Sequence, residues 1–188
     1  TPSDIPEWAT FFEQKDYLPY LGIPILEDTT EMAKNWIGFQ LERYKNNRYG
    51  LLALIEKTSG KLIGQCGVLP RELEGEKEFE IGFSLIPKYW GKGYAIEAAR
   101  YFRDFAFEND LTDSLISIIQ INNISSIKVA EKNGMHKTIQ ATYFGMDVFL
   151  FAISCSVQLQ SLYFHACGYF LNGITCTYII GIIFYFRK

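Results

Sequence analysis

The chain has 188 residues, of which 48% are hydrophobic and 21% charged, the size and balance of a globular domain with a buried core. Its net charge of −3 argues against a protein that coats nucleic acid. The chain has two histidines and four cysteines, with no Cys-x-x-Cys pair, which argues against a metal site. We therefore expect a cytoplasmic protein with reduced thiols that binds neither metal nor nucleic acid.

The N-terminal part of the chain predicts two helices followed by a hairpin. The helices are expected over residues 4–14 and 27–47, and the second carries apolar side chains at helical spacing with Thr29 or Thr30 as its N-cap. Residues 49–69 read as two strands that turn around a Thr-Ser-Gly sequence.

Residues 77–86 alternate between apolar and less apolar side chains, which predicts a half-buried strand. Glu80, Gly82 and Ser84 share the less apolar face. Glu80 is therefore a candidate general base, and the competing interpretation is an ordinary solvated carboxylate.

A glycine-rich turn, KYWGKGYA, occupies residues 88–95 between this strand and a predicted helix. Glycine allows close approach of the backbone, and the free N–H groups of a helix start attract anions. The turn thus predicts an anion site, with an ordinary surface turn as the alternative. The spacing of a Walker A loop is absent, and so is the third small residue of a dinucleotide fingerprint.

The remaining charged part of the chain predicts a helix, a strand, a helix and a hairpin. An apolar run at residues 114–121 predicts a buried strand, and residues 122–134 predict a helix that ends at an Asn-Gly pair. Two strands are expected around Phe144-Gly145.

Four stretches now support a resemblance: LIGQCGVL, FEIGFSLIPKYWGKGYAIEA, NISSIKVAEKNGM and GMDVFLFAI. In this order they resemble the GNAT superfamily of acyl-CoA-dependent N-acyltransferases, within the branch that includes ribosomal-protein N-acetyltransferases (RimJ/RimL-like). The resemblance covers residues 1–154. It implies an α/β fold with a mixed, mostly antiparallel sheet and helices on both faces, here without the family's usual first strand.

The resemblance also implies a coenzyme A site. The family's motif, Gln/Arg-x-x-Gly-x-Gly/Ala, begins here with Trp90, which departs from the usual first residue. Backbone groups of Leu85 and Ile86 would bond the pantetheine arm. The residues expected at the cofactor phosphates are Trp90, Gly91, Lys92, Gly93, Tyr94, Ala95 and Ile96.

The family's Asn-x-x-Ser pattern appears as Asn123 and Ser126. By resemblance Asn123 contacts the cofactor, and Ser126 lies near the thioester sulfur as a proton donor. Ala130 stands where many relatives have a tyrosine acid. The alternative is that Asn123 is only an N-cap and Ser126 only a polar helix residue.

Residues 155–188 differ from the rest, because no charged residue occurs between Val148 and Phe186. Three interpretations of this tail stay open. It could be a membrane segment over Leu162–Phe186, a hairpin around Asn172-Gly173, or a sequence that is not native coding.

The resemblance implies an N-acetyltransferase in which an amine attacks acetyl-CoA directly, without a metal. The acceptor would be a protein N-terminus or a small-molecule amine. The alternative is an acyl-CoA-binding regulatory module without turnover. A homodimer and a tail-anchored form are both compatible with the sequence.

Overall fold

A computed structural model describes residues 1–73, 75–155, 178–179 and 182–184. The first elements are helical: α1 spans Ile5–Ala9, a short 3-10 segment follows at Thr10–Phe12, and α2 spans Thr29–Lys45. The sequence predicted both helices. It was wrong about the cap of α2, because the Asp28 carboxylate accepts hydrogen bonds from the N–H groups of Thr30 and Glu31 at 2.8 and 3.2 Å.

The strands and remaining helices follow the predicted order. Their bounds are β1 Leu51–Glu56, β2 Leu62–Leu73, β3 Glu76–Leu85, α3 Tyr94–Glu108, β4 Ser114–Gln120, α4 Ile124–Lys132, β5 His136–Tyr143 and β6 Met146–Ser154. The β5–β6 turn lies at Phe144 and Gly145, which both have positive φ angles, 47° and 75°.

The described strands form one sheet in the order β5-β6-β4-β3-β2-β1-β8-β7. The neighbouring strands pair antiparallel, except that β3 and β4 run parallel. This is the mixed, mostly antiparallel α/β sheet that the sequence predicted.

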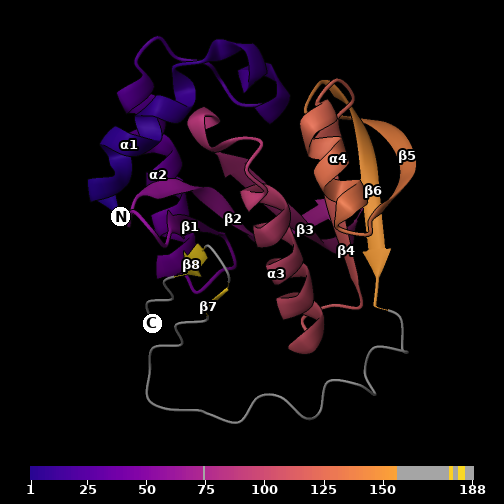
Figure 1. The fold of residues 1–188 in the computed structure, drawn as a ribbon. Helices are drawn as coiled ribbons and strands as arrows, with labels where there is room; N and C mark the ends of the chain where they lie inside the picture. The colour runs from indigo at the N-terminus through magenta and orange to yellow at the C-terminus, as the bar shows by residue number, and fades with distance from the viewer. Residues whose placement is uncertain (74, 156–177, 180–181, 185–188) are drawn as a thin grey trace.

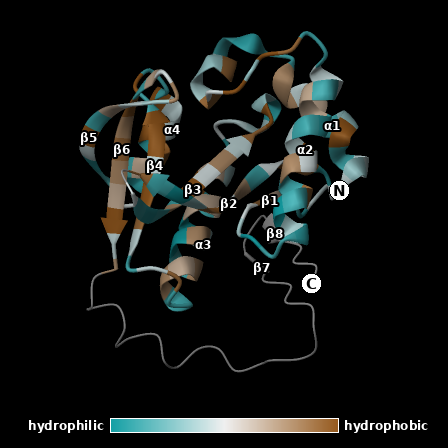
Figure 2. Cartoon of the chain, turned by 180° about the vertical axis from the view of Figure 1, so that it is seen from behind, coloured by the Kyte–Doolittle hydropathy of each residue, from teal (hydrophilic) through white to brown (hydrophobic). Residues whose placement is uncertain are grey.

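Helices cover both faces of the sheet (Figures 1 and 2). On one face, Ala98 and Phe102 of α3 are buried in the same core cluster as Ile81 and Leu85 of β3. Apolar side chains on α3 at helical spacing therefore cover one side of the strand. Helix α4 lies beside α3, and Arg103 of α3 donates to the Asn133 carbonyl at 2.9 Å.

The other face carries α1 and α2 with an aromatic core between them. Trp8 stacks on Phe11 with ring centroids 4.5 Å apart, and Trp36 of α2 lies 6.3 Å from Trp8. These rings bury a large apolar area, so they hold α2 at a fixed position over the sheet.

The tail contributes two short strands to the described structure, β7 (Tyr178–Ile179) and β8 (Ile182–Phe184). Strand β8 pairs with β1 at Leu54–Glu56, so it extends the sheet beyond β1. The turn predicted at Asn172-Gly173 and most of the expected membrane segment lie outside the described residues. Within the described residues, no helix has the length and apolarity needed to cross a bilayer.

Strands β3 and β4 pair at one position, Glu80 opposite Ile116, and then separate. Beyond that point β3 stays paired with β2 as far as Leu85. The sheet therefore opens between β3 and β4 toward the ends of both strands. Because the two strands are parallel, the helices that follow them, α3 and α4, begin at this same edge (Figure 1).

Candidate active site

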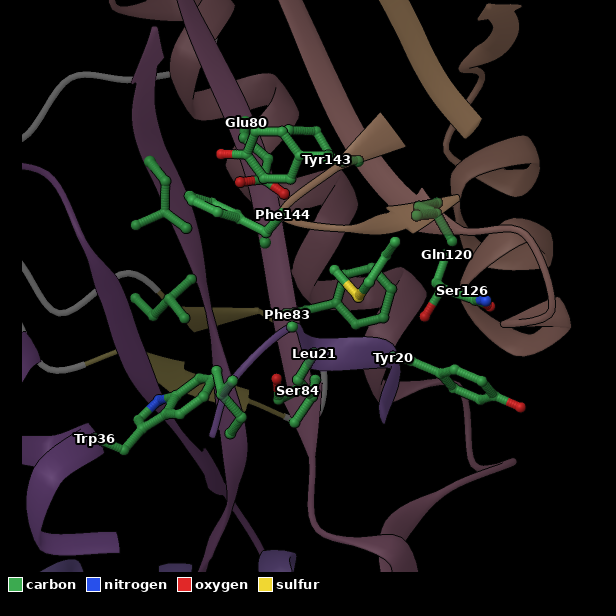
Figure 3. Close-up of a pocket in the computed structure, with 18 of the residues that line it drawn as sticks. Tyr20, Leu21, Trp36, Glu80, Phe83, Ser84, Gln120, Ser126, Tyr143 and Phe144 are labelled. Carbon is green, nitrogen blue, oxygen red and sulfur yellow. The ribbon is translucent and has the colours of Figure 1, made fainter. Parts of the chain in front are cut away.

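A cavity of about 800 Å³ occupies the opening between the two strands, on the side of the sheet that carries α2. Glu80, Gly82 and Ser84 line it from β3, together with Ile81 and Phe83 of the same strand. Asn123 and Ser126 line it from the start of α4. Figure 3 shows Glu80 and Ser126 from these two elements around the same space, with Trp36 of α2 on a further side.

Glu80 sits at the last paired position before the strands separate. The residue is 8% exposed, and its Oε2 accepts a hydrogen bond from Arg71 Nε at 2.5 Å. The Ile118 N–H also donates to this carboxylate. Burial raises the pKa of Glu80, while the charge and hydrogen bond of Arg71 and the Ile118 N–H act in the opposite direction. Glu80 is thus a desolvated and paired carboxylate, and the alternative of a solvated one is wrong.

Arg71 and Arg43 are site residues that the sequence analysis missed. Arg71 lines the cavity from β2. Leu69 lies directly opposite Glu80 in the β2–β3 pairing, and Arg71 follows Leu69 by two residues on β2. Arg43 lines it from α2 in the series Met32, Trp36, Gln40 and Arg43. That helical spacing was a usable signal, because it places the polar residues Gln40 and Arg43 on the same face of α2 as Met32 and Trp36.

Asn123 caps α4, because its Oδ1 accepts a hydrogen bond from the Ser126 N–H at 3.2 Å. The interpretation of Asn123 as an N-cap is therefore correct. The cap also fixes the first turn of α4 at the cavity wall, and Ser126 is partly buried there. Structural and functional interpretations of Asn123 are compatible.

The backbone of β3 presents polar groups to the opening between the strands. The Ile86 N–H donates to the Ile63 carbonyl at 2.9 Å. With the antiparallel register of β2 and β3, this bond means that the backbone N–H and C=O groups of even-numbered residues point toward β2. The backbone groups of odd-numbered residues on β3 therefore point toward β4. The Ser117 hydroxyl donates to one of these groups, the Ile81 carbonyl, at 3.0 Å. Phe83 and Leu85 are the next residues to face the opening.

Ile86 is poorly suited to bond the pantetheine arm of the cofactor, the role that the family resemblance implied for its backbone. Its N–H is used by Ile63, and its carbonyl accepts from the Tyr89 N–H at 2.9 Å. The Leu85 carbonyl accepts from the indole Nε1 of Trp90 at 2.7 Å. The hydrogen bonds therefore favour Phe83 and the Leu85 N–H, rather than Ile86, as partners for a ligand in the opening.

Trp90 to Ile96 form the turn and first residues of α3 and lie outside the cavity lining. Gly91 and Gly93 have φ angles of 74° and 90°, conformations that favour glycine. Gly93 is the N-cap and has no side chain to bond the first N–H groups of α3. Lys92 Nζ lies 5.1 Å from the centroid of the Tyr89 ring. The turn keeps the open helix start that an anion requires.

Other residues take structural roles. Cys66 is fully buried, and burial raises the pKa of its thiol, so it belongs to the core. Among the described residues there is no group of three or more potential ligands that could hold a metal ion.

Tyr143 and Phe144 of the β5–β6 turn line the cavity, and the sequence analysis did not anticipate them as site residues (Figure 3).

Residues 1–136 match the family model described as an acetyltransferase (GNAT) domain. This chain belongs to the GNAT acetyltransferase family. Members of the family transfer an acyl group from acetyl-CoA.

Known proteins agree with this assignment. The Bacillus subtilis (strain 168) protein YkkB is 36% identical over 135 residues, which are 71% of this chain and 77% of YkkB. An acetyltransferase structure from Agrobacterium tumefaciens str. C58 has a TM-score of 0.65 at 27% identity, covering 81% of this chain and 86% of that one. The structure of RimL, a ribosomal-protein α-N-acetyltransferase in complex with coenzyme A, has a TM-score of 0.62 at 14% identity and covers 82% and 90% of the two chains. At this low identity, the similarity to RimL shows a shared fold only.

Proposed function

We propose that this protein is an acetyl-CoA-dependent N-acetyltransferase in which an amine bound in the cavity attacks the thioester directly. The observation that carries the proposal is the opening between β3 and β4, where Glu80 of β3 and Ser126 of α4 line one cavity from opposite sides of the gap. Acetyl-CoA supplies the activated acetyl group. We expect the reaction in the cytoplasm, where thiols such as Cys66 stay reduced.

Two parts of the chain would hold the cofactor. Backbone groups of Phe83 and Leu85 would bond the amides of the pantetheine arm in the opening. The N–H groups at the start of α3, from Gly91 to Ile96, would bond the pyrophosphate, and Lys92 would add a positive charge. These residues fit the cofactor because an unpaired strand edge and an uncapped helix start lie at the same edge of the sheet.

Glu80 is proposed as the general base. The acceptor nitrogen must lose a proton as its bond to the acetyl carbon forms, and a water molecule would carry that proton to Glu80. Burial raises the pKa of the carboxylate, which makes it a stronger base than a solvated glutamate. The charge and hydrogen bond of Arg71 act in the opposite direction and favour the ionised form that can accept a proton.

Ser126 is proposed to stabilise the leaving thiolate. As the carbon–sulfur bond breaks, its hydroxyl would donate a hydrogen bond or a proton to the sulfur. The serine is held in the first turn of α4 by the Asn123 cap. Ala130 is buried one turn further on, so this helix offers no tyrosine for the same task.

The proposal is tested by following thiol release from acetyl-CoA with a panel of amines that includes peptides, amino acids, polyamines and aminoglycosides. We expect Glu80→Gln to lower kcat/KM by about 10²–10⁴-fold with coenzyme A affinity unchanged. Ser126→Ala is expected to lower kcat with little effect on KM. Glu76→Gln on the same strand and Ser125→Ala on the same helix are matched controls, because neither residue lines the cavity.

Two results would contradict the proposal in different ways. If neither variant slows acetyl transfer while coenzyme A still binds, the assignment of Glu80 and Ser126 is wrong. If the wild-type protein binds coenzyme A and acetylates no amine of the panel, the alternative of a regulatory acyl-CoA-binding module replaces the enzyme.

A further inference from the structure

The part of the cavity around Glu80 contains two basic groups and one acidic group, a property that bears on the acceptor. Two guanidinium groups, from Arg43 and Arg71, line the cavity near one carboxylate, Glu80. Arg71 is paired with Glu80 through its Nε at 2.5 Å. None of the ion pairs among the described residues includes Arg43, so its guanidinium is not bonded directly to a carboxylate.

Arg43 is 9% exposed, which is unusual for an arginine without a carboxylate partner. One Nη donates to the Tyr49 carbonyl at 3.2 Å, and the guanidinium lies 4.9 Å from the centroid of the Phe39 ring. Its Nε is buried and has no hydrogen-bond partner among the described residues. A buried donor without a partner carries a cost in free energy.

Charges of both signs lie around Arg43. Burial and the charges of Arg48 and Arg71 lower the pKa of Arg43, while the charges of Glu80 and Tyr44 act in the opposite direction. The other acidic residue that lines the cavity is Glu31, which is exposed. It precedes Arg43 by twelve residues on α2, a separation of about 18 Å along the helix axis.

We propose that the acceptor carries a carboxylate close to its amine, as a free amino acid does, and that this carboxylate binds Arg43. The inference rests on the proposed function and names its substrate class. A guanidinium is always charged and offers paired donors that match a carboxylate. The amine would then lie on the Glu80 side of the same cavity. A polyamine would leave Arg43 unpaired and add repulsion, so the geometry favours the zwitterion.

The walls suggest which amino acids to use as probes. Trp36, Phe39 and Phe144 line the cavity, and Phe39 and Phe144 are strongly exposed. These rings suit an apolar side chain, because burying them against it removes apolar area from water. Leucine, methionine and phenylalanine are therefore the acceptors to compare, each with its primary amide.

The experiment measures kcat/KM for each amino acid and its amide with saturating acetyl-CoA. For the wild-type protein we expect the free acid to be preferred by at least about tenfold, the value of one charged contact. In Arg43→Gln the ratio of acid to amide should fall toward one. The ratio is taken within one preparation, so it does not depend on the folded fraction. Arg48→Gln is the matched control, because it removes a neighbouring charge outside the cavity lining and should keep the wild-type ratio.

Three outcomes overturn the inference. They are a wild-type ratio of one or below, turnover of spermidine or of peptide amines above that of the amino acids, and an unchanged ratio in Arg43→Gln. Each of these leaves the proposed acetyltransferase standing, because an amine is still acetylated. Absence of turnover with every amine overturns the proposed function itself and with it the inference.

Discussion

At the scale of single residues, the site depends on how Glu80 is paired. Burial and Arg71 act on its pKa in opposite directions, and burial dominates. A carboxyl whose pKa is raised in the folded protein contributes stability at low pH, and this contribution is lost as the pH rises through the folded pKa. The ion pair with Arg71 limits that loss. The proposed catalysis needs the ionised form of Glu80, so we expect Arg71 to affect both activity and stability.

Arg71→Met should move the acid limb of the kcat/KM profile to higher pH. The variant removes the cation that favours ionised Glu80, so the pKa of Glu80 rises further and the base is protonated over a wider range. It should also lower the free energy of unfolding by about 1–3 kcal/mol at neutral pH, and by less in acid, where Glu80 gains a proton.

The measurements are pH–rate profiles and urea unfolding at several pH values. Arg48→Met serves as the control for loss of an arginine, because Arg48 is exposed and lies outside the cavity lining. An acid limb that stays in place or moves to lower pH in Arg71→Met would exclude Glu80 as the base.

At the scale of elements, the start of α3 is notable because its N-terminus has no side-chain cap. Its N-cap is Gly93, so no side chain satisfies the first turn. Trp90 reaches back from the same turn to the end of β3, where it occupies the Leu85 carbonyl. The turn therefore connects the proposed phosphate site to the proposed pantetheine site.

Gly93→Ala should weaken coenzyme A binding by roughly tenfold beyond any effect on folding, because its Cβ would stand where the phosphates approach. The protein itself has room for this atom, since a Cβ at Gly93 would meet no heavy atom within 4 Å. The left-handed backbone would still cost about 1–2 kcal/mol of stability.

Gly75→Ala is a close control for that variant. Gly75 has a φ of 87° against 90° for Gly93, and its Cβ would also meet no heavy atom within 4 Å. Both variants should lose similar stability in thermal unfolding, while isothermal titration with coenzyme A separates them. Equal affinities in the two variants would remove the start of α3 from the cofactor site.

At the scale of the whole molecule, residues up to the end of β6 contain the complete candidate site. Every cavity-lining residue falls between Tyr20 and Val148, and β6 ends at Ser154. We therefore propose an acetyltransferase domain over residues 1–154. The tail reaches this domain in the described structure at the edge of β1, where β8 pairs with Leu54–Glu56.

A chain that ends at Cys155 should bind coenzyme A with an affinity within about twofold of the full chain, because the change is remote from the site. It should also self-associate more, since the edge of β1 that β8 covers would be exposed to other chains. Titration calorimetry and size-exclusion chromatography test the two statements. A large loss of affinity on truncation would mean that the tail belongs to the functional domain.

The order of elements up to β6 could be predicted from the sequence because it depends on local patterns. The alternation on residues 77–86 predicted strand β3, and the glycine turn predicted the start of α3. The Arg71–Glu80 pair could not be predicted in the same way, because it requires the register of two strands. The backbone direction of Phe83 and Leu85 depends on the same register.

The position of Arg43 required knowledge of tertiary packing. Its helical spacing indicates the inner face of α2, but the sheet residues it meets depend on how the aromatic core docks that helix. The cap of α2 was missed for a simpler reason. Three consecutive residues, Asp28, Thr29 and Thr30, can all act as caps, and local sequence does not decide among them.

The single bridge between β3 and β4 divides the sheet into two blocks, β1–β3 with α3 and β4–β6 with α4. Other contacts also join the blocks, among them the hydrogen bond from Ser117 to the Ile81 carbonyl and the bonds from Arg100 and Arg103 to the end of α4. A cofactor that touches both blocks would strengthen the junction, and a ligand at a hundred times its Kd stabilises the native state by about 2.7 kcal/mol. The supply of acetyl-CoA would then set how long each copy of the protein survives in the cell, as well as how fast it works.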